Sequence, residues 1–182
     1  RVAPYRLDRG QFTLTGSGPC SSSGDGVAWS NPGYNYLRGG QTATETCQYT
    51  MIGPDNHNHV ATVTITITGS NDAPTLDAIS NKNVNEQAPL SFGTSASDPD
   101  QGDSLSYSLD ATSIARGMSI NPTTGVFNWT PTESQGGASY SVTVTVTDNG
   151  TNPSNLTDSK TFSINVAEVN VAPVLAAITT KN

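Results

Sequence analysis

Three carboxylates lie within one short stretch of the sequence, Ser97–Asp103, which reads Ser-Asp-Pro-Asp-Gln-Gly-Asp. The acids are Asp98, Asp100 and Asp103, and no lysine or arginine lies within ten residues of either end. Like charges on a short loop repel one another unless a cation lies between them. Ca²⁺ suits such a place, because it binds roughly six to eight oxygen atoms of carboxylates, carbonyls and water. The stretch therefore indicates either a calcium site or a solvated acidic loop.

The segments that carry this stretch are predicted to be β-strands. The chain of 182 residues contains 17 Gly and 11 Pro and has no long segment of helix-forming residues. Seven strand-like segments joined by turns within about 100 residues predict an all-β fold, a Greek-key sandwich of the Ig-like class. The predicted strands are 83–87, 90–97, 104–109, 117–120, 125–130, 138–148 and 158–168.

Alternating side chains predict which strand faces are buried. Ser141–Thr147 alternates valine with hydroxyl residues, Lys160–Ala167 places its apolar residues on one face, and Val60–Thr68 alternates aliphatic residues with threonine. The aromatic residues expected in the core or at its rim are Tyr107, Phe127, Trp129 and Tyr140. For Trp129 the alternative is an exposed ring on which a sugar could stack.

An internal repeat predicts the domain boundaries. Residues 71–83 recur as residues 170–182, at an offset of 99 residues and with eight of thirteen positions identical. This offset is about the size of one Ig-like sandwich. We therefore expect a partial or divergent β domain at 1–70, a complete sandwich at 71–169 and the first strand of a further repeat at 170–182. The chain is then a piece of a tandem array.

The two cysteines, Cys20 and Cys47, lie in the first 70 residues, and their spacing fits no zinc pattern. In a secreted protein, two such cysteines indicate one disulfide. Cys47 lies on the apolar face of an alternating segment, Thr42–Met51. A bridge to Cys20 would therefore tie an early loop onto the core.

The charge of the chain is unevenly distributed. The formal net charge is −7, and residues 1–70 carry four acids and four bases, whereas residues 71–169 carry eleven acids and three bases. So acidic a segment argues against nucleic-acid binding, which needs clustered Lys and Arg. No apolar run approaches the roughly 20 residues of a membrane span. We therefore expect neither a nucleic-acid partner nor a transmembrane segment.

Five short motifs follow one another in residues 71–169 in a particular order and spacing: Asn85-Glu86, Ser97–Asp100, Leu105–Leu109, Asn121–Phe127 and Val146–Gly150. On these motifs, residues 71–169 resemble a bacterial cadherin-like repeat of the dystroglycan-type or putative-Ig class. A second set of segments lies in residues 34–74: Gly40–Thr46, Tyr49-Thr50, Ala61–Gly69 and Asn71–Pro74. On these segments, residues 34–74 resemble the end of a VCBS-type surface repeat.

The first resemblance implies a Ca²⁺ site at the joint with the preceding repeat. Asp98 and Asp100 match the Asp-x-Asp pair of the family, and Asp148 matches a further ligand from the same domain. These residues would face the upstream linker, where Asn71 and Asp72 lie.

The resemblance also implies a site at the downstream joint. Glu86 matches the acid that faces the downstream linker, near Asn170, and Glu133 is a looser candidate. Both linkers hold fewer acids than the linkers of animal cadherins, and Val171 stands where the upstream linker has Asp72. The resemblance therefore implies one ion or none at each joint.

These observations predict an extracellular or cell-surface module that acts as a structural or adhesive repeat. Calcium would stiffen its joints, and its partners would be neighbouring repeats or, by homotypic self-association, other copies. One alternative is a carbohydrate- or peptide-binding module appended to a secreted enzyme. Another is a filament subunit whose strand 170–182 completes a neighbouring domain. No catalytic role is expected, because the sequence lacks a Gly-x-Ser-x-Gly motif and neither histidine lies near the acidic stretch.

Overall fold

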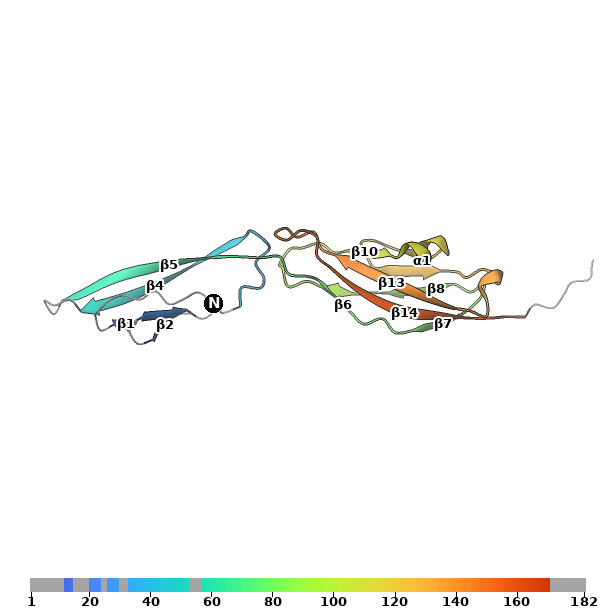
Figure 1. Ribbon diagram of the computed structural model, residues 1–182, viewed down its shortest axis with the longest axis horizontal. Helices are drawn as coiled ribbons and strands as arrows, with labels where there is room; N and C mark the ends of the chain where they lie inside the picture. Colours follow the sequence, from blue (N-terminus) through green and yellow to red (C-terminus); the bar gives the residue numbers. More distant parts are fainter. Residues whose placement is uncertain (1–11, 15–19, 24–25, 30–32, 53–56, 171–182) are drawn as a thin grey trace, which may run out of the picture. The chain divides into compact units, whose positions relative to one another are not determined.

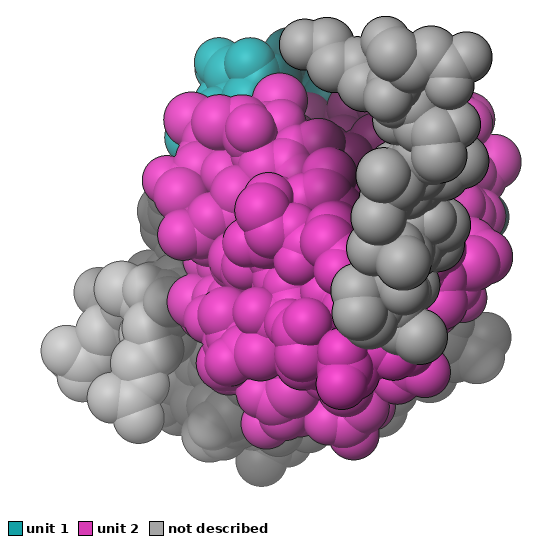
Figure 2. All heavy atoms as spheres, turned by 90° about the vertical axis from the view of Figure 1, so that its right-hand side faces the viewer, with its two compact units in different colours: residues 1–73, 98–104, 149–156 teal, residues 74–97, 105–148, 157–182 magenta. Residues whose placement is uncertain are grey.

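The computed structural model describes residues 12–14, 20–23, 26–29, 33–52 and 57–170, some of them, such as Cys20, by their backbone alone. The chain divides into two compact units, which Figure 2 distinguishes by colour. Unit 1 comprises residues 1–73, 98–104 and 149–156, and unit 2 comprises residues 74–97, 105–148 and 157–182. Two loops from later in the chain thus belong to the same unit as the N-terminal residues. The boundaries 1–70, 71–169 and 170–182 remain a prediction.

Unit 1 is built on a long antiparallel hairpin of β4 (Thr42–Ile52) and β5 (Asn58–Thr68), shown in Figure 1. The short strand β1 (Phe12–Leu14) pairs with β4, and β2 (Cys20–Ser23) pairs with β3 (Gly26–Trp29). The predicted alternation is confirmed, because the threonines of β5 are exposed whereas its aliphatic residues from position 61 to 67 are partly buried.

The partly buried face of β4 carries one acid, Glu45. The hydroxyl of Tyr34 donates a hydrogen bond to Oε1 of Glu45. This bond, with smaller effects of desolvation and of the Glu45 charge, raises the pKa of Tyr34 to about 12. Cys47 lies on the same face of β4 and is buried, as predicted.

Unit 2 is an all-β sandwich with little helix, as Figure 1 shows. One sheet has four strands in the order β10-β13-β14-β7, another has three in the order β11-β12-β8, and β6 pairs with β9. The strands are β6 (Thr75–Leu76), β7 (Lys82–Asn85), β8 (Leu90–Gly93), β9 (Ala96–Ser97), β10 (Ser106–Leu109), β11 (Ser119–Ile120), β12 (Val126–Trp129), β13 (Ser139–Thr147) and β14 (Thr157–Ala167). Each of the seven predicted strand segments contains strand residues.

The predicted core is also confirmed. The three valines of β13 and Ile164 of β14 are fully buried, and they pack in one cluster with Phe127 of β12. Trp129 is 3% exposed, and its Nε1 donates to the carbonyl of Arg116 at 3.1 Å. The interpretation of Trp129 as an exposed sugar platform is therefore wrong, because its ring packs edge-on against Tyr140 inside the fold.

Two short helices were not predicted. α1 (Ala111–Ala115) follows β10, and the 3₁₀ helix η1 (Glu133–Gln135) follows β12. Asp110 caps α1, because its Oδ1 accepts a hydrogen bond from the Ser113 amide at 2.9 Å. Its other oxygen, Oδ2, accepts from the amide of Thr143 at 2.9 Å and thereby joins α1 to β13.

The pairing of β14 with β7 is parallel, with Ala167 opposite Asn85. β14 also pairs with β13 in the antiparallel direction, so β14 is a central strand and β7 is an edge strand. Because parallel strands end at the same side of a sheet, the residues that follow β7 and β14 lie next to each other. The acids Glu86 and Glu168 are these residues.

Candidate metal sites

The acidic stretch of the sequence forms a compact group within unit 1. We call Asp98, Asp100 and Asp103 the acidic loop cluster, because each offers a carboxylate oxygen and these oxygens all lie within 4.8 Å of one another. Asp100 is the most buried residue of the three, at 2% exposed. Two oxygens bound to one Ca²⁺ at about 2.4 Å each can be separated by up to about 5 Å. The spacing therefore fits a single shared cation.

Local hydrogen bonds hold this loop in shape. Oδ1 of Asp98 accepts from the amide of Asp100 at 2.8 Å, and the amide of Asp103 donates to the carbonyl of Asp100 at 3.3 Å. Gly102 has a φ of 91°, in the left-handed region that favours glycine. The Gly in the stretch thus permits the turn that brings the third acid back toward the first two.

The linker residues Asn71 and Asp72, which belong to unit 1, contact loops of the same unit. Oδ2 of Asp100 accepts a hydrogen bond from the amide of Asp72 at 2.8 Å, whereas the Asp72 residue is exposed. Asn71 is 4% exposed, and its amide donates to the carbonyl of Asn152 at 3.1 Å. The structure therefore brings Asn71 and Asp72 to the two loops, 98–104 and 149–156, that belong to unit 1.

A basic residue also reaches the acidic loop cluster. Arg38 forms an ion pair with Asp103, whose side chain has no exposed surface. The guanidinium of Arg38 also donates to Oδ1 of Asn149 at 3.2 Å, and the same oxygen accepts from the amide of Ser104 at 2.8 Å. Asp103 thus has a charge partner that was not apparent in the sequence, because 65 positions separate the two residues.

Asp100 and Asp103 each have a buried oxygen without a hydrogen-bond partner among the described residues. Oδ1 of Asp100 is buried and has no hydrogen-bond partner among the described residues. Burying a carboxylate oxygen without a partner is costly, so such atoms normally contact a donor, a cation or water. The donor set consists of oxygen atoms alone, which is the set that Ca²⁺ and Mg²⁺ prefer and that zinc and copper sites seldom use.

A second acidic group lies wholly within unit 2. We call Glu86, Glu133 and Glu168 the glutamate cluster, since their carboxylate oxygens also lie within 4.8 Å of one another. Glu86 is 4% exposed, its Oε1 accepts from the amide of Val169 at 2.8 Å, and its Oε2 is buried without a hydrogen-bond partner among the described residues. Gly136 packs directly on this oxygen, because a Cβ there would lie 2.0 Å from it.

The carboxylates of the glutamate cluster repel one another. The Glu86 carboxylate, with desolvation and the Glu133 carboxylate as further causes, raises the pKa of Glu168 above its ordinary value. Gln87 donates a hydrogen bond to Oε2 of Glu133, which is an uncharged partner. Three acids are therefore held together without a described cationic side chain among them, and a bound cation would relieve the repulsion.

The structure brings some of the predicted site residues together. Asp98 lies beside Asp100, and Glu86 lies beside Glu133. Asp148 is buried at 4% exposed directly after β13 in unit 2, and Asn170 is exposed. Their roles as ligands remain predictions.

Two members of the clusters were missing from the predicted ligand sets. Asp103 belongs to the acidic stretch, so its signal was present in the sequence. Glu168 was assigned only to the end of a strand, and the parallel pairing that places it beside Glu86 could not be read from the sequence. The predicted Cys20–Cys47 disulfide stays a prediction, because the side chain of Cys20 lies outside the described residues.

Comparisons with solved structures agree with the fold. Mouse Cadherin-23 EC22-24 is 17% identical with a TM-score of 0.56, and the match covers 88% of this chain and 53% of that chain. Human Mucin-like Protocadherin EC1-2 is 17% identical with a TM-score of 0.53, covering 91% and 87%. The Protocadherin GammaB4 extracellular domain is 20% identical with a TM-score of 0.52, and this chain spans 27% of its length. At such identities the likeness shows the fold alone, which is cadherin-like.

Three further findings concern the class of protein to which the chain belongs. No curated protein matches the chain. In the part of the chain that the structure describes, no helix has the length and apolar character needed to cross a membrane. The family model for the Putative Ig domain matches residues 73–167. Because this match covers more than half of the sequence, the chain belongs to the Putative Ig domain family.

Proposed function

We propose that this chain is a segment of an extracellular structural or adhesive repeat protein in which calcium fixes the linker between successive domains. The observation that carries the proposal is the buried Oδ1 of Asp100, which belongs to a group of three carboxylates and has no hydrogen-bond partner within the described part of the chain. The same residue binds the linker through its other oxygen. An ion at Asp100 would therefore act on a residue that already holds the linker.

The ligands that we assign to this ion come from the acidic loop cluster. Asp98 and Asp100 supply carboxylate oxygens, and Asn71, Asp72 and Asp148 are the further ligands that the family resemblance implies. Calcium accepts carboxylate and amide oxygens together and fills its remaining positions with water. When bound, it would supply the positive charge that offsets repulsion between the acids.

The glutamate cluster supports a second calcium site, at the other linker. Glu86 and Glu168 lie where β7 and β14 end, and Glu133 comes from η1. The raised pKa of Glu168 indicates that this arrangement is strained electrostatically at neutral pH without a cation. We assign Asn170, two residues after Glu168, as a further ligand.

The consequence would be mechanical. Small interfaces between domains allow relative motion by default, so a linker held by a few hydrogen bonds is expected to bend. These bonds include those from the Asn71 backbone amide to the carbonyl of Asn152 and from the Asp72 backbone amide to Oδ2 of Asp100. A cation shared between the linker and the acidic loop would add bonds that resist bending, and successive repeats would then transmit force or present surfaces in a fixed register.

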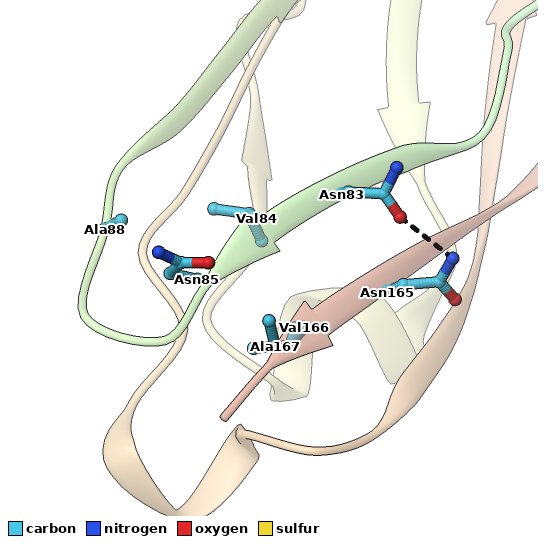
Figure 3. A pocket seen from close by; sticks show the side chains of 7 residues that line it. All are labelled: Asn83, Val84, Asn85, Ala88, Asn165, Val166 and Ala167. Carbon is cyan, nitrogen blue, oxygen red and sulfur yellow. Dashed lines mark hydrogen bonds between the residues drawn. The ribbon is translucent and has the colours of Figure 1, made fainter. Parts of the chain in front are cut away.

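A carbohydrate- or peptide-binding function has weaker support. A hollow of about 430 Å³ lies over β7 and β14 and is lined by three asparagines and four small apolar residues (Figure 3). Asn165 donates to Asn83 there at 3.1 Å, and such amides can bind sugar hydroxyls. No aromatic ring lines the hollow, so a sugar would lack a stacking surface. The filament alternative depends on residues 170–182, of which 171–182 lie outside the described residues.

Calcium binding by the full chain tests the proposal. Isothermal titration of the calcium-free protein should show binding that Mg²⁺ competes for only weakly. Asp98→Asn combined with Asp100→Asn should remove one class of site. The matched control is Asp77→Asn combined with Asp158→Asn, which removes the same charge from residues outside both clusters and should leave binding intact. Equal loss in both double variants would mean that only net charge matters and would sink the proposal.

A further inference from the structure

We propose that Arg38 is a built-in cation of the acidic loop cluster and that it limits this cluster to a single divalent ion. The guanidinium would take the place that a second metal ion would otherwise have. The part of this proposal that concerns metal rests on the proposed function. The part that concerns Arg38 and Asp103 can be tested without metal.

The position of Arg38 is fixed by its own loop. The amide of Arg38 donates to Oε1 of Gln41 at 3.1 Å, and the amide of Gln41 donates to the carbonyl of Arg38 at 2.9 Å. The amide of Gln101, inside the acidic loop, donates to the carbonyl of Tyr36 at 3.0 Å. Hydrogen bonds therefore fix the backbone near both partners of the ion pair, and this positions the guanidinium of Arg38 beside Asp103.

The burial of Asp103 distinguishes this ion pair from an ordinary surface pair. Exposed ion pairs contribute little, because water screens them. The Asp103 side chain has no exposed surface, and the Arg38 side chain is 31% exposed. A buried carboxylate that loses its partner is left as an uncompensated charge, so this pair is expected to matter for stability. Arginine stays protonated throughout the physiological range and therefore supplies a permanent positive charge.

The charges of the cluster then balance with one divalent ion. Three carboxylates in the acidic loop cluster face one guanidinium, which leaves two negative charges. One Ca²⁺ would neutralise these two charges, so a second ion could draw only on the carboxylates of Asp72 and Asp148, which lie outside the cluster. Oδ2 of Asp103 is buried without a hydrogen-bond partner among the described residues, so Asp103 can serve the guanidinium with one oxygen and the ion with the other.

Removal of Arg38 should change two measured quantities in opposite directions: the stability of the calcium-free protein should fall, and the affinity for calcium should rise. Without Arg38 the cluster has one more uncompensated negative charge, so the calcium-free protein should be less stable. The same extra charge should attract calcium more strongly, and the dissociation constant should fall by roughly fivefold or more at low salt. A variant that merely damages the loop would lower both stability and affinity.

The experiment uses the full chain with Glu86→Gln, which disables the glutamate cluster, and compares it with added Arg38→Gln, Asp103→Asn and the combination of both. Thermal unfolding is recorded in EDTA, and CaCl₂ binding is measured by isothermal titration. We expect Arg38→Gln to unfold at a lower temperature in EDTA and to bind calcium more tightly. The combined variant should be more stable in EDTA than Arg38→Gln alone, because the buried charge of Asp103, which Arg38 had paired, is then absent. Arg38→Lys, which keeps the charge, should bind calcium with nearly the affinity of the parent.

The outcomes separate this proposal from the proposed function. Absence of calcium binding by the parent would refute the proposed function, yet non-additive unfolding temperatures in EDTA would still support the role of Arg38 as a cation for Asp103. Unchanged or weaker calcium binding by a folded Arg38→Gln variant would overturn the limit on metal number. Additive unfolding temperatures in EDTA would overturn the role of Arg38 itself.

Discussion

At the scale of single residues, Gly150 shows how closely the loops of unit 1 pack around Asn71. A Cβ at position 150 would lie 1.6 Å from Oδ1 of Asn71, which no side-chain adjustment of a few tenths of an ångström can relieve. We therefore predict that Gly150→Ala displaces Asn71 and weakens calcium binding by roughly tenfold or more, as loss of supporting contacts commonly does at metal sites. Gly93→Ala is the control, because a Cβ there meets nothing within 4 Å. Equal affinities for the two variants, measured by isothermal titration, would contradict this assignment.

Hydrogen bonds determine the direction in which the pKa of Asp110 is shifted. Burial acts to raise its pKa, but bonds from Ser113, Thr143 and Thr112 outweigh it, so the pKa of Asp110 is lower than usual. Asp110→Ala should cost about 1 kcal/mol of stability at neutral pH, the typical value of a helix cap.

The sign of the pH dependence follows from the lowered pKa. A carboxylate with a depressed folded-state pKa stabilises the fold above its unfolded pKa and loses that effect as pH falls through the folded value. The difference between the native chain and Asp110→Ala in urea unfolding should therefore shrink in acid. A difference that stays constant from neutral to acid pH would show that the Asp110 charge is not involved.

Glu168 should behave in the opposite way. Its pKa is raised chiefly by Glu86, so in the absence of metal its ionisation opposes folding, and stability should increase as pH falls through the raised value. We predict that calcium lowers the pKa of Glu168, because a bound cation favours the charged form. NMR titration of the Glu168 carboxyl with and without CaCl₂ measures this directly, and the same pKa in both conditions would exclude Glu168 as a ligand.

At the scale of elements, the alternation in β13 allows a test within one strand. Val144 is fully buried, whereas Thr145 lies on the opposite face. Val144→Ala should cost about 2 kcal/mol, from lost apolar burial and the resulting cavity. Thr145→Ala should change stability by less than about 0.5 kcal/mol. Chemical unfolding compares the two, and equal costs would contradict the assignment of faces.

The strands were predictable because their signals are local. The valines of β13 alternate with hydroxyl residues, and the apolar residues of β14 alternate with Thr161, Ser163 and Asn165. Burial of one face follows from that pattern. α1 was not predictable in the same way, because five residues give too short a pattern. Its boundary depends on Asp110, whose bond to Thr143 exists only after β13 has docked.

The sites were only partly predictable, for a similar reason. Asp98 and Asp100 lie two residues apart, so their proximity could be predicted from the sequence alone. Arg38 reaches Asp103 only because two loops of the folded chain meet, and Glu168 lies beside Glu86 only because β14 and β7 run parallel. Contacts between distant segments depend on the topology of the fold. From a single sequence, the topology can be inferred only through resemblance to a family.

At the scale of the whole molecule, the apolar core and the metal are expected to have different roles. Unit 2 has its own apolar cluster, so its fold is expected to persist without calcium. The sandwich should therefore stay folded in EDTA, at an unfolding temperature lowered only by loss of the bound ion, whereas the linker residues 69–73 should gain mobility. Amide hydrogen exchange resolved by segment can distinguish these effects. Collapse of protection throughout β13 and β14 in EDTA would show that the metal instead holds the sandwich together.

The central claim is that calcium bound through Asp98 and Asp100 stiffens the linker. Small-angle X-ray scattering of the full chain in CaCl₂ and in EDTA measures the spread of molecular dimensions directly. We predict one narrow distribution with calcium, a broader one in EDTA, and the broader one in both conditions for Asp98→Asn combined with Asp100→Asn. Indistinguishable distributions for the native chain with and without calcium, under conditions where titration shows the ion bound, would contradict the claim.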